Sequence, residues 1–295
     1  MLYLKKFWLP TAREEEGSLH VNPKLNMQCY SNTNVYPFRI FPPKQLGEIE
    51  FAPITIFYGG NGSGKSTLLN VIAEKLELDR SSMFNKTPFV EDYLNCCDFE
   101  LAFGLERAPD GSRIITSDDV FDFLLDVRAI NEGVDHERNT VFEEYAELNR
   151  GKRQLLQGLD DLERFQKQAE ARWKKGTRSK YTARRIPSEL SGKSNGESAF
   201  SYFTQKIVER ALYLLDEPEN SLSATLQKEL ARFIEDSARF YKCQFVISTH
   251  SLFLLAMKDA VIYDLDCVPV TVRAWTELAN VRAYYDFFKE HAEEF

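Results

Sequence analysis

Four short motifs along the chain contain the residue types that phosphate chemistry uses. They are Gly-Gly-Asn-Gly-Ser-Gly-Lys-Ser at 59–66, Ser-Asn-Gly-Glu at 194–197, Leu-Leu-Asp-Glu-Pro at 214–218 and Ser-Thr-His at 248–250. A glycine-rich loop with a lysine can hold phosphate groups, adjacent carboxylates can bind Mg²⁺ and orient water, and a histidine can donate a hydrogen bond. Together, in this order, they predict the hydrolysis of a nucleoside triphosphate.

The first motif has the GxxxxGKS spacing of a Walker A loop. A β-branched and aromatic run at 54–58 precedes it and 67–73 continue at helical spacing, so the loop should join a strand to a helix. Its glycines let backbone N–H groups turn toward one anion, and the helix dipole adds positive charge. An accidental glycine-rich turn is the alternative, which the complete motif in this context disfavours. The predicted nucleotide-binding residues are Gly59, Asn61, Gly62, Ser63, Gly64, Lys65, Ser66 and Thr67, with Lys65 reaching the β- and γ-phosphates and Ser66 binding Mg²⁺.

An acidic pair ends a second predicted strand. Residues 211–215 form a continuous apolar run, typical of a parallel strand buried on both faces, and Asp216 and Glu217 follow at its carboxyl end. Ligand sites in open α/β sheets lie at that edge. We therefore expect Asp216 to hold Mg²⁺ through its water shell and Glu217 to orient or deprotonate the attacking water.

The turn after the acidic pair contains Asn220, Ser221, Leu222 and Ser223 and precedes a predicted helix. Ser221 or Ser223 is a candidate helix cap, and the same turn is a candidate D-loop that contacts a facing subunit. Another apolar strand, 244–247, leads to His250, which we expect to donate to the γ-phosphate. An ordinary core or surface histidine is the alternative, but the position at a strand's carboxyl end favours the sensor. The predicted catalytic residues are Glu217, His250 and Lys65.

Length and composition predict a globular protein. The 295 residues, 43% of them hydrophobic, can bury the core of one large or two smaller domains. The sequence shows neither a membrane-spanning apolar stretch nor a signal-peptide pattern, so we expect a cytoplasmic protein without a membrane partner. Five scattered cysteines predict reduced thiols, and four dispersed histidines suggest no metal beyond the Mg²⁺ of the nucleotide.

Basic charge is concentrated between Arg150 and Arg185. This segment contains twelve Lys or Arg residues and four Asp or Glu residues, so its formal charge is +8. Because the net charge of the chain is −8, the remaining residues carry a charge of −16. With Trp173 and Tyr181 interleaved, the segment can follow a nucleic-acid backbone and stack on a base, or it can be a solvated face or an internal counter-charge. The candidate contacts to DNA or RNA are Lys174, Lys175, Arg178, Lys180, Arg184 and Arg185.

A helical seam of apolar residues lies between Thr140 and Arg172, at three-, four- and seven-residue spacing. It is too short for a long coiled-coil arm and fits a helical hairpin or one amphipathic helix. Its apolar face can pack on its own domain or on a partner. Its members are Tyr145, Leu148, Leu155, Leu159, Leu162 and Phe165.

Together these motifs resemble the ABC-type ATPases related to the SMC and RecF heads. More narrowly, the chain is similar to small stand-alone bacterial ATPases of the AAA/ABC type, OLD-like heads without a nuclease domain. In that family an SxGES-like signature and DEPExxLS precede a THS turn, as they do here at 194–198, 216–223 and 249–251. The resemblance extends from about residue 36 to the C-terminus and departs at about 130–186, which is longer than the family's connection.

The resemblance implies an α/β P-loop NTPase fold. Its central, mostly parallel sheet would be flanked by helices, with an antiparallel β part at the N-terminus. One ABC-type domain would occupy 1–295, with a helical, basic insertion at 130–186 and the signature, Walker B and histidine half at 187–295. The implied cofactors are ATP and Mg²⁺.

The resemblance also implies a homodimer in which two heads pair head to tail. Each ATP would lie between Walker A of one subunit and Ser194, Gly196 and Glu197 of the other. A helix starting near Ser194 would offer N–H groups to the partner's γ-phosphate. An ordinary helix N-cap, with Glu197 as its capping-box partner, is the alternative.

One element of related ATPases is missing or disguised. The sequence contains no glutamine between Lys65 and Gln154 that could serve as the Mg²⁺ ligand those proteins place after Walker A. Asp118, in the apolar-then-polar stretch 114–121, is a candidate hard oxygen ligand. A capping serine with aspartates opening the helix 120–129 explains the same residues equally well.

Three hypotheses of function remain. The first is an ATP-hydrolysing switch that controls a nucleic-acid-related process or an effector such as a nuclease or toxin, as in DNA repair or antiviral defence. The second is the ATPase subunit of a transporter, which the Ser194 signature and the absent glutamine disfavour. The third is a non-hydrolytic module stabilised by ATP, which the retention of Glu217 and His250 disfavours.

Overall fold

The computed structural model describes residues 1–22, 35–84, 86–130 and 194–294. It divides into two compact units, residues 1–121 with 195–295 and residues 122–194. Nearly all of the expected insertion at 130–186, with its apolar seam and the six candidate nucleic-acid contacts, lies outside the described residues. The motif residues, except Ser194, belong to the first unit.

Nineteen elements have defined bounds among the described residues, and residues 117–130 are also helical. They are β1 (Leu4–Trp8), α1 (Ala12–His20), η2 (Pro42–Lys44), β2 (Glu48–Glu50), β3 (Ile54–Tyr58), α2 (Lys65–Lys75), α3 (Val90–Asn95), β4 (Asp98–Leu101), β5 (Arg113–Thr116), α7 (Asn195–Lys206), β6 (Leu212–Asp216), α8 (Ala224–Phe240), β7 (Gln244–Ser248), α9 (Leu252–Leu255), β8 (Val261–Asp264), β9 (Thr271–Val272), η4 (Trp275–Glu277), α10 (Ala279–Glu290) and η5 (Ala292–Glu294).

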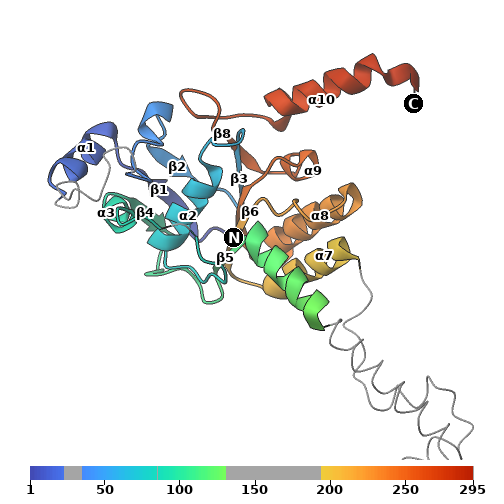
Figure 1. Ribbon diagram of the computed structural model, residues 1–295, viewed down its shortest axis with the longest axis horizontal. Helices are drawn as coiled ribbons and strands as arrows, with labels where there is room; N and C mark the ends of the chain where they lie inside the picture. Colours follow the sequence, from blue (N-terminus) through green and yellow to red (C-terminus); the bar gives the residue numbers. More distant parts are fainter. Residues whose placement is uncertain (23–34, 85, 131–193, 295) are drawn as a thin grey trace, which may run out of the picture. The chain divides into compact units, whose positions relative to one another are not determined.

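A sheet lies at the centre of the first unit (Figure 1). It has six strands in the order β5-β6-β7-β3-β8-β9. Its strands pair in parallel except for β8 with β9. Strands β3, β6 and β7 are buried almost throughout, as their continuous apolar runs predict for a sheet covered on both faces. The predicted α/β fold with a mostly parallel sheet is confirmed.

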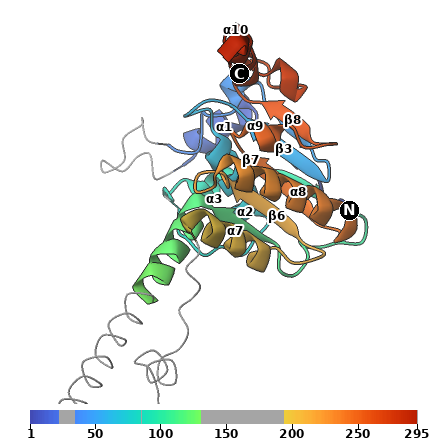
Figure 2. The same cartoon turned by 90° about the vertical axis from the view of Figure 1, so that its right-hand side faces the viewer.

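The register of this sheet aligns the ends of four motif-bearing segments. Asp216 pairs with Ser248, Ser248 pairs with Phe57 one residue before the end of β3, and Thr116 pairs with Asp216. Because the strands are parallel, their carboxyl ends meet at one edge. Helix α2 packs against β5, β6 and β7, while α7 and α8 pack against each other (Figure 2).

A second, antiparallel sheet of β2, β1 and β4 contains N-terminal strands, which confirms the expected antiparallel part. The side chain of Gln244, at the start of β7, ties this sheet to the first. Its Oε1 accepts hydrogen bonds from the backbone N–H groups of Tyr3 at 2.7 Å and Leu4 at 2.8 Å, and its Nε2 donates to Leu4 O. The fully buried amide thus has backbone partners for both its oxygen and its nitrogen.

The segment Tyr36 to Ile40 is a turn, although its aromatic and β-branched residues would also suit an edge strand. Phe38 is 3% exposed and lies edge-on against Tyr93. Arg39 adopts a positive φ of 69°, and its backbone N–H donates to Glu15 Oε2 rather than to a neighbouring strand. This local contact with α1 takes the place of ladder hydrogen bonds.

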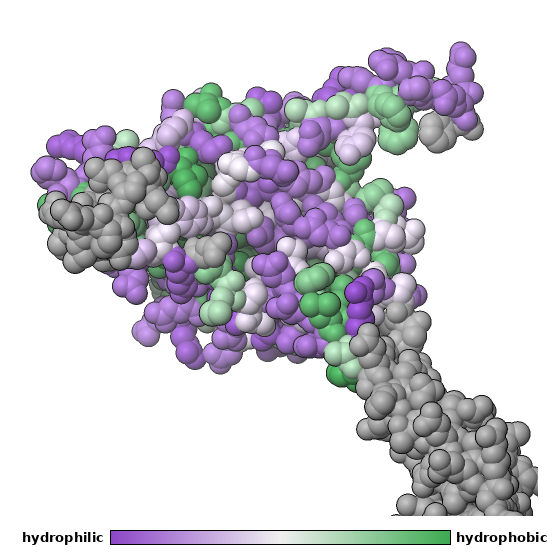
Figure 3. Space-filling model, in the orientation of Figure 1, coloured by the Kyte–Doolittle hydropathy of each residue, from purple (hydrophilic) through white to green (hydrophobic). Residues whose placement is uncertain are grey.

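Much of the visible surface is polar, as expected for a chain with 28% charged residues (Figure 3). Helix α10 is an exception, because Tyr284, Tyr285, Phe287 and Phe288 are each about half exposed. Among the helices that the structure describes, none combines the length and the hydropathy that crossing a bilayer requires.

Candidate nucleotide-binding site

The predicted phosphate loop connects β3 to α2, and α2 begins at Lys65 as expected. Gly62 and Gly64 have φ values of 79° and 96°, a conformation that favours glycine. Ser63 is 5% exposed, and its hydroxyl has no hydrogen-bond partner. A Cβ at Gly59 would lie 2.6 Å from that hydroxyl oxygen, so only glycine allows this close approach.

Lys65 is almost completely buried, with 4% of its surface exposed. Its Nζ donates hydrogen bonds to the carbonyl oxygens of Gly59 at 2.8 Å and Gly60 at 3.2 Å. Burial lowers the pKa of Lys65, and the nearby carboxylates of Glu217 and Asp216 act in the opposite direction. The ammonium group is therefore held inside the loop where a phosphate would lie.

Asp216 joins the loop to two strands. Its Oδ1 accepts a hydrogen bond from Ser66 Oγ at 3.0 Å and another from Ser248 Oγ. Burial raises the pKa of Asp216, and these two hydrogen bonds oppose that shift. Two hard oxygen atoms, Ser66 Oγ and Asp216 Oδ1, thus lie next to each other at the start of α2.

Glu217 is held at the same edge by its backbone and its side chain. Its φ is 47°, and its N–H donates to the carbonyl oxygen of Ser248 at 3.1 Å. Its Oε2 accepts from Asn220 Nδ2 at 3.1 Å, while its Oε1 lies 3.9 Å from Lys65 Nζ and 3.6 Å from His250 Nε2. The three predicted catalytic side chains therefore converge on one carboxylate oxygen.

His250 follows directly after β7, on a turn whose backbone is bound by another carboxylate. Its N–H donates to Glu219 Oε1 at 2.6 Å. The His250 side chain is 29% exposed, but its Nε2 atom is shielded from solvent and has no hydrogen-bond partner. This buried imidazole nitrogen beside Glu217 can donate a hydrogen bond to a ligand atom or accept one from it.

These residues fit the phosphate groups and metal that the loop predicts. The unpartnered hydroxyl of Ser63 and the buried ammonium of Lys65 are donors suited to phosphate oxygen atoms. Ser66 and Asp216 supply the oxygen ligands that Mg²⁺ prefers. Asn61 lies on the exposed part of the loop, and Thr67 Oγ1 accepts a hydrogen bond from the Tyr36 hydroxyl.

The signature residues lie at the start of α7. Ser194 and Glu197 are exposed, whereas Gly196 faces the candidate D-loop. A Cβ at Gly196 would lie 2.8 Å from Leu226 Cδ1 and 3.5 Å from the carbonyl oxygen of Ser221, so glycine lets α7 approach α8 closely.

The candidate D-loop connects β6 to α8. Asn220 contacts Glu217, Leu222 is buried, and Ser223 caps α8 by accepting from Leu226 N at 3.4 Å. Of the two serines predicted as caps, Ser223 has this geometry.

The region of Asp118 follows β5, beside β6 in the sheet. Thr116 and Asp119 form a capping arrangement there, because Asp119 Oδ2 accepts from Thr116 N at 2.7 Å and Thr116 Oγ1 accepts from Asp119 N at 3.4 Å. The predicted cap is thus present with one of the expected aspartates, but Thr116 takes the place of the serine. The assignment of Asp118 as an Mg²⁺ ligand stays a prediction.

Sequence reasoning missed three residues of the site. Ser248 binds Asp216 and Glu217, Glu219 binds the turn that carries His250, and Asp266 Oδ2 accepts from Gly60 N at 2.7 Å. Ser248 belongs to the Ser-Thr-His motif and Glu219 to the DEPExxLS motif, so the sequence could have indicated a role for both residues. Asp266 gave no such signal, because its contact depends on β8 lying beside β3.

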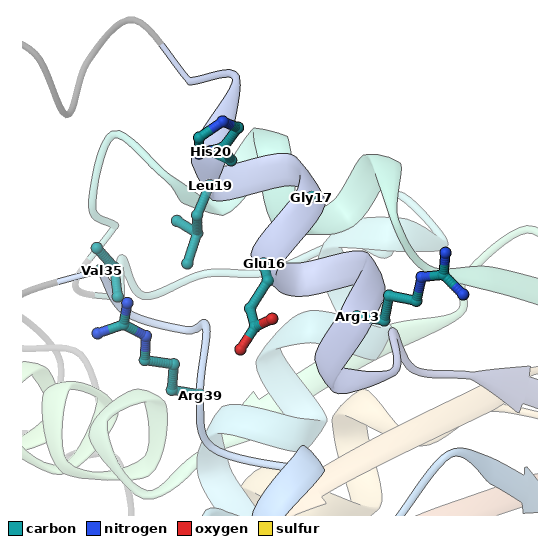
Figure 4. Close-up of a pocket in the computed structure, with 7 residues that line it drawn as sticks. All are labelled: Arg13, Glu16, Gly17, Leu19, His20, Val35 and Arg39. Carbon is teal, nitrogen blue, oxygen red and sulfur yellow. The ribbon is translucent and has the colours of Figure 1, made fainter.

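Away from these motifs, a pocket of about 620 Å³ lies beside α1 (Figure 4). Glu16 and Leu19 extend from the helix toward the segment of Val35 and Arg39 (Figure 4). Arg13, Gly17 and His20 complete the lining. None of the predicted nucleotide-binding residues lines it.

A protein-family model described as "AAA domain, putative AbiEii toxin, Type IV TA system" matches residues 98–256, more than half of the chain. The chain belongs to this AAA domain family. The match includes the signature, the acidic strand end and the His250 turn, and the phosphate loop precedes it. This family agrees with the predicted resemblance to bacterial ATPases of the AAA type.

Several solved structures are similar to this AAA-family chain. The SMC head domain from Thermotoga maritima is 14% identical, with 89% of this chain and 94% of that chain covered and a TM-score of 0.38. The Smc head domain with an extended coiled coil, bound to the C-terminal domain of ScpA derived from Pyrococcus furiosus, is 16% identical, with coverages of 99% and 100% and a TM-score of 0.42. A dimeric ATP-binding cassette in a post-hydrolysis state, bound to ADP and Pi, is 14% identical, with coverages of 78% and 90% and a TM-score of 0.36. No curated protein matches the chain.

Proposed function

We propose that the protein is an ATP-hydrolysing switch that dimerises head to tail around two ATP–Mg²⁺ and controls a nucleic-acid-related process or an effector protein. One observation carries the hydrolytic part. Glu217 Oε1 lies within 4 Å of both Lys65 Nζ and His250 Nε2, at the sheet edge where the phosphate loop begins. A water-activating carboxylate, a phosphate-binding cation and an imidazole donor are thereby brought together.

In this mechanism Glu217 accepts the proton of the attacking water at Oε1, while Asn220 holds its other oxygen. Lys65 exchanges its loop carbonyl partners for phosphate oxygen atoms, and His250 donates from Nε2 to the γ-phosphate. Mg²⁺ held by Ser66 and Asp216 neutralises phosphate charge when it is bound. The role of the protein is therefore mainly positioning and electrostatic stabilisation.

The proposed dimer is supported by the exposure of Ser194 and Glu197 at the start of α7. Backbone N–H groups at a helix start bind anions, so this end can meet the γ-phosphate held by a second subunit. In the proposed dimer, each copy therefore presents Ser194 and Glu197 to the phosphate loop of the other.

Sedimentation of the Glu217→Gln variant tests the dimer. With ATP–Mg²⁺ we expect a species of twice the monomer mass of 34.1 kDa, and with ADP–Mg²⁺ the monomer. Adding Ser194→Arg to that variant should restore the monomer with ATP, because a bulky cation at the helix start blocks the partner site. A mass independent of the nucleotide would contradict the proposed dimer.

The controlled process is tested by the effect of nucleic acids on ATP turnover. We expect double-stranded DNA, single-stranded DNA or RNA to stimulate phosphate release, and charge reversal of Lys174, Lys175, Arg184 and Arg185 to remove the stimulation. Turnover that no nucleic acid alters would favour an effector protein such as a nuclease or toxin. Co-purification with a membrane permease would instead support the transporter alternative.

A further inference from the structure

Glu219 binds the whole turn that carries His250. Its Oε1 accepts hydrogen bonds from Thr249 Oγ1 at 2.7 Å, His250 N at 2.6 Å and Ser251 N at 3.1 Å. Three donors on one carboxylate oxygen leave little freedom to the backbone of that turn. The Thr249 hydroxyl also accepts from Ser251 N at 3.0 Å, which closes the turn on itself.

The backbone of Glu219 directly precedes the candidate D-loop and is hydrogen-bonded to it. Its carbonyl oxygen accepts from Leu222 N at 2.9 Å, and Asn220 N donates to Glu217 O at 3.2 Å. The segment from Glu217 to Leu222 is therefore a compact turn. One residue is fixed in this turn by its main chain and in the histidine turn by its side chain.

Gln227 of α8 makes a second, parallel connection between the same two turns. Its Oε1 accepts from Ser251 Oγ at 2.7 Å, and its Nε2 donates to the carbonyl oxygen of Leu222 at 2.9 Å. Together the side chains of Glu219 and Gln227 connect the candidate D-loop to the residues on both sides of His250. Short hydrogen bonds thus form a continuous path from the D-loop backbone to the turn of His250.

The chemistry of Glu219 indicates more than a role in stability. Its Oε2 is shielded from solvent and has no hydrogen-bond partner, and burial raises the pKa of Glu219, an effect that the donors from Thr249 and His250 oppose. A shielded, unpartnered carboxylate oxygen is costly to stability. We therefore infer that Glu219 is retained because it fixes the position of the turn that carries His250.

We propose that Glu219 is a positioning residue that couples the D-loop to His250, so that contact of the D-loop with a second subunit sets the distance between His250 Nε2 and Glu217. The proposal rests on the proposed ATP hydrolysis in a dimer. Glu219 itself touches neither water nor phosphate in this scheme. It acts through the backbone N–H of His250. Fixing this backbone position also fixes where the imidazole side chain of His250 starts.

A double-mutant cycle tests the coupling. In the 295-residue chain, Glu219→Ala should lower kcat for ATP about a hundredfold, the scale of a displaced catalytic group, with KM changed less than about threefold. If Glu219 acts through His250, the double variant with His250→Ala should be no slower than His250→Ala alone. Independent losses that multiply in the double variant would overturn the proposal, as would an unchanged kcat in Glu219→Ala.

Glu219→Gln keeps an acceptor oxygen in place and replaces only Oε2, the oxygen that has no partner. We therefore expect it to retain kcat within about tenfold of the parent. A folded Glu219→Gln that loses as much as Glu219→Ala would also overturn the proposal, and this variant decides the question if Glu219→Ala does not fold.

Glu235 offers a matched control, because its Oε1 likewise accepts a backbone N–H, from Lys258 at 2.7 Å. Glu235→Ala should leave kcat unchanged. A similar loss of kcat in Glu235→Ala would mean that any hydrogen bond from a backbone N–H to a carboxylate affects turnover. That result would contradict a specific link between Glu219 and His250. If the parent hydrolyses no ATP, the proposed function itself fails, an outcome distinct from additive losses in an active parent.

Discussion

Ser66 Oγ donates a 3.0 Å hydrogen bond to Asp216 Oδ1, although the two residues are 150 positions apart in the chain. This contact joins the start of α2 to the end of β6. Because both oxygen atoms are hard ligands, the pair is the best candidate for the Mg²⁺ site among the described residues.

Ser66→Ala should weaken Mg²⁺-dependent ATP binding about tenfold or more, since one of the two oxygen ligands is lost. Titration of a fluorescent ATP analogue with Mg²⁺ and with EDTA measures this effect. In EDTA the parent and the variant should bind alike, which is the internal control. Equal weakening in both buffers would assign Ser66 to the phosphates rather than to the metal.

Lys65→Met should abolish the rise in Tm that ATP–Mg²⁺ gives the parent, because the phosphates lose the cation. Without nucleotide the variant should melt no lower than the parent. The reason is that burial penalises the ammonium of Lys65 in the folded state. Thermal unfolding of both proteins, with and without nucleotide, checks this, and a persisting ATP-induced rise in the variant would speak against Lys65 as a phosphate ligand.

Asp266→Ala should weaken ATP binding by about threefold to tenfold, because Gly60 N loses its acceptor and the phosphate loop loosens. Asp266→Asn keeps an acceptor oxygen and should bind nearly as the parent does. Calorimetric titration with ATP–Mg²⁺ measures all three proteins. Tighter binding by Asp266→Ala would show instead that the carboxylate repels the phosphates.

The free energy of unfolding should depend on pH through Glu15, which is 2% exposed. Burial raises its pKa from 4.5 to about 7, although the Arg39 N–H favours the charged form. A raised carboxyl pKa stabilises the folded state below about pH 4.5, and this contribution is lost as the pH rises toward 7. The cost at pH 8 is on the order of 1–3 kcal/mol.

Glu15→Gln removes this titration and retains an acceptor for Arg39 N. We therefore expect the variant to be more stable than the parent at pH 8, with the difference shrinking or reversing near pH 5. Urea unfolding at both pH values provides the comparison. A stability difference independent of pH would rule out the titration of Glu15 as its cause.

Much of the site could be predicted because its residues directly follow apolar runs. Asp216 and Glu217 lie at the end of β6 and His250 lies after β7, so a parallel sheet necessarily brings them to one edge. Likewise α2 begins at Lys65, where the glycines end. Local pattern and parallel pairing together determine these positions.

Other contacts depend on the order of the strands, which the local sequence does not contain. Asp266 reaches Gly60 because β8 lies beside β3, although the two residues are 206 positions apart. The turn at Phe38 could not be predicted either, since its aromatic and β-branched residues suit a strand as well as a buried turn. Glu219 belongs to the DEPExxLS motif, but its three hydrogen-bond donors follow β7. These contacts could be predicted only once β6 and β7 were known to be neighbours in the sheet.

In the proposed mechanism, Glu217 activates water for ATP hydrolysis. The most direct measurement is phosphate release from ATP–Mg²⁺ by the parent and by Glu217→Gln, with ATP binding measured on the same samples. We predict turnover by the parent, a loss of at least about a hundredfold in the variant and unchanged or tighter ATP binding. A variant that binds ATP and releases phosphate as fast as the parent would contradict the account.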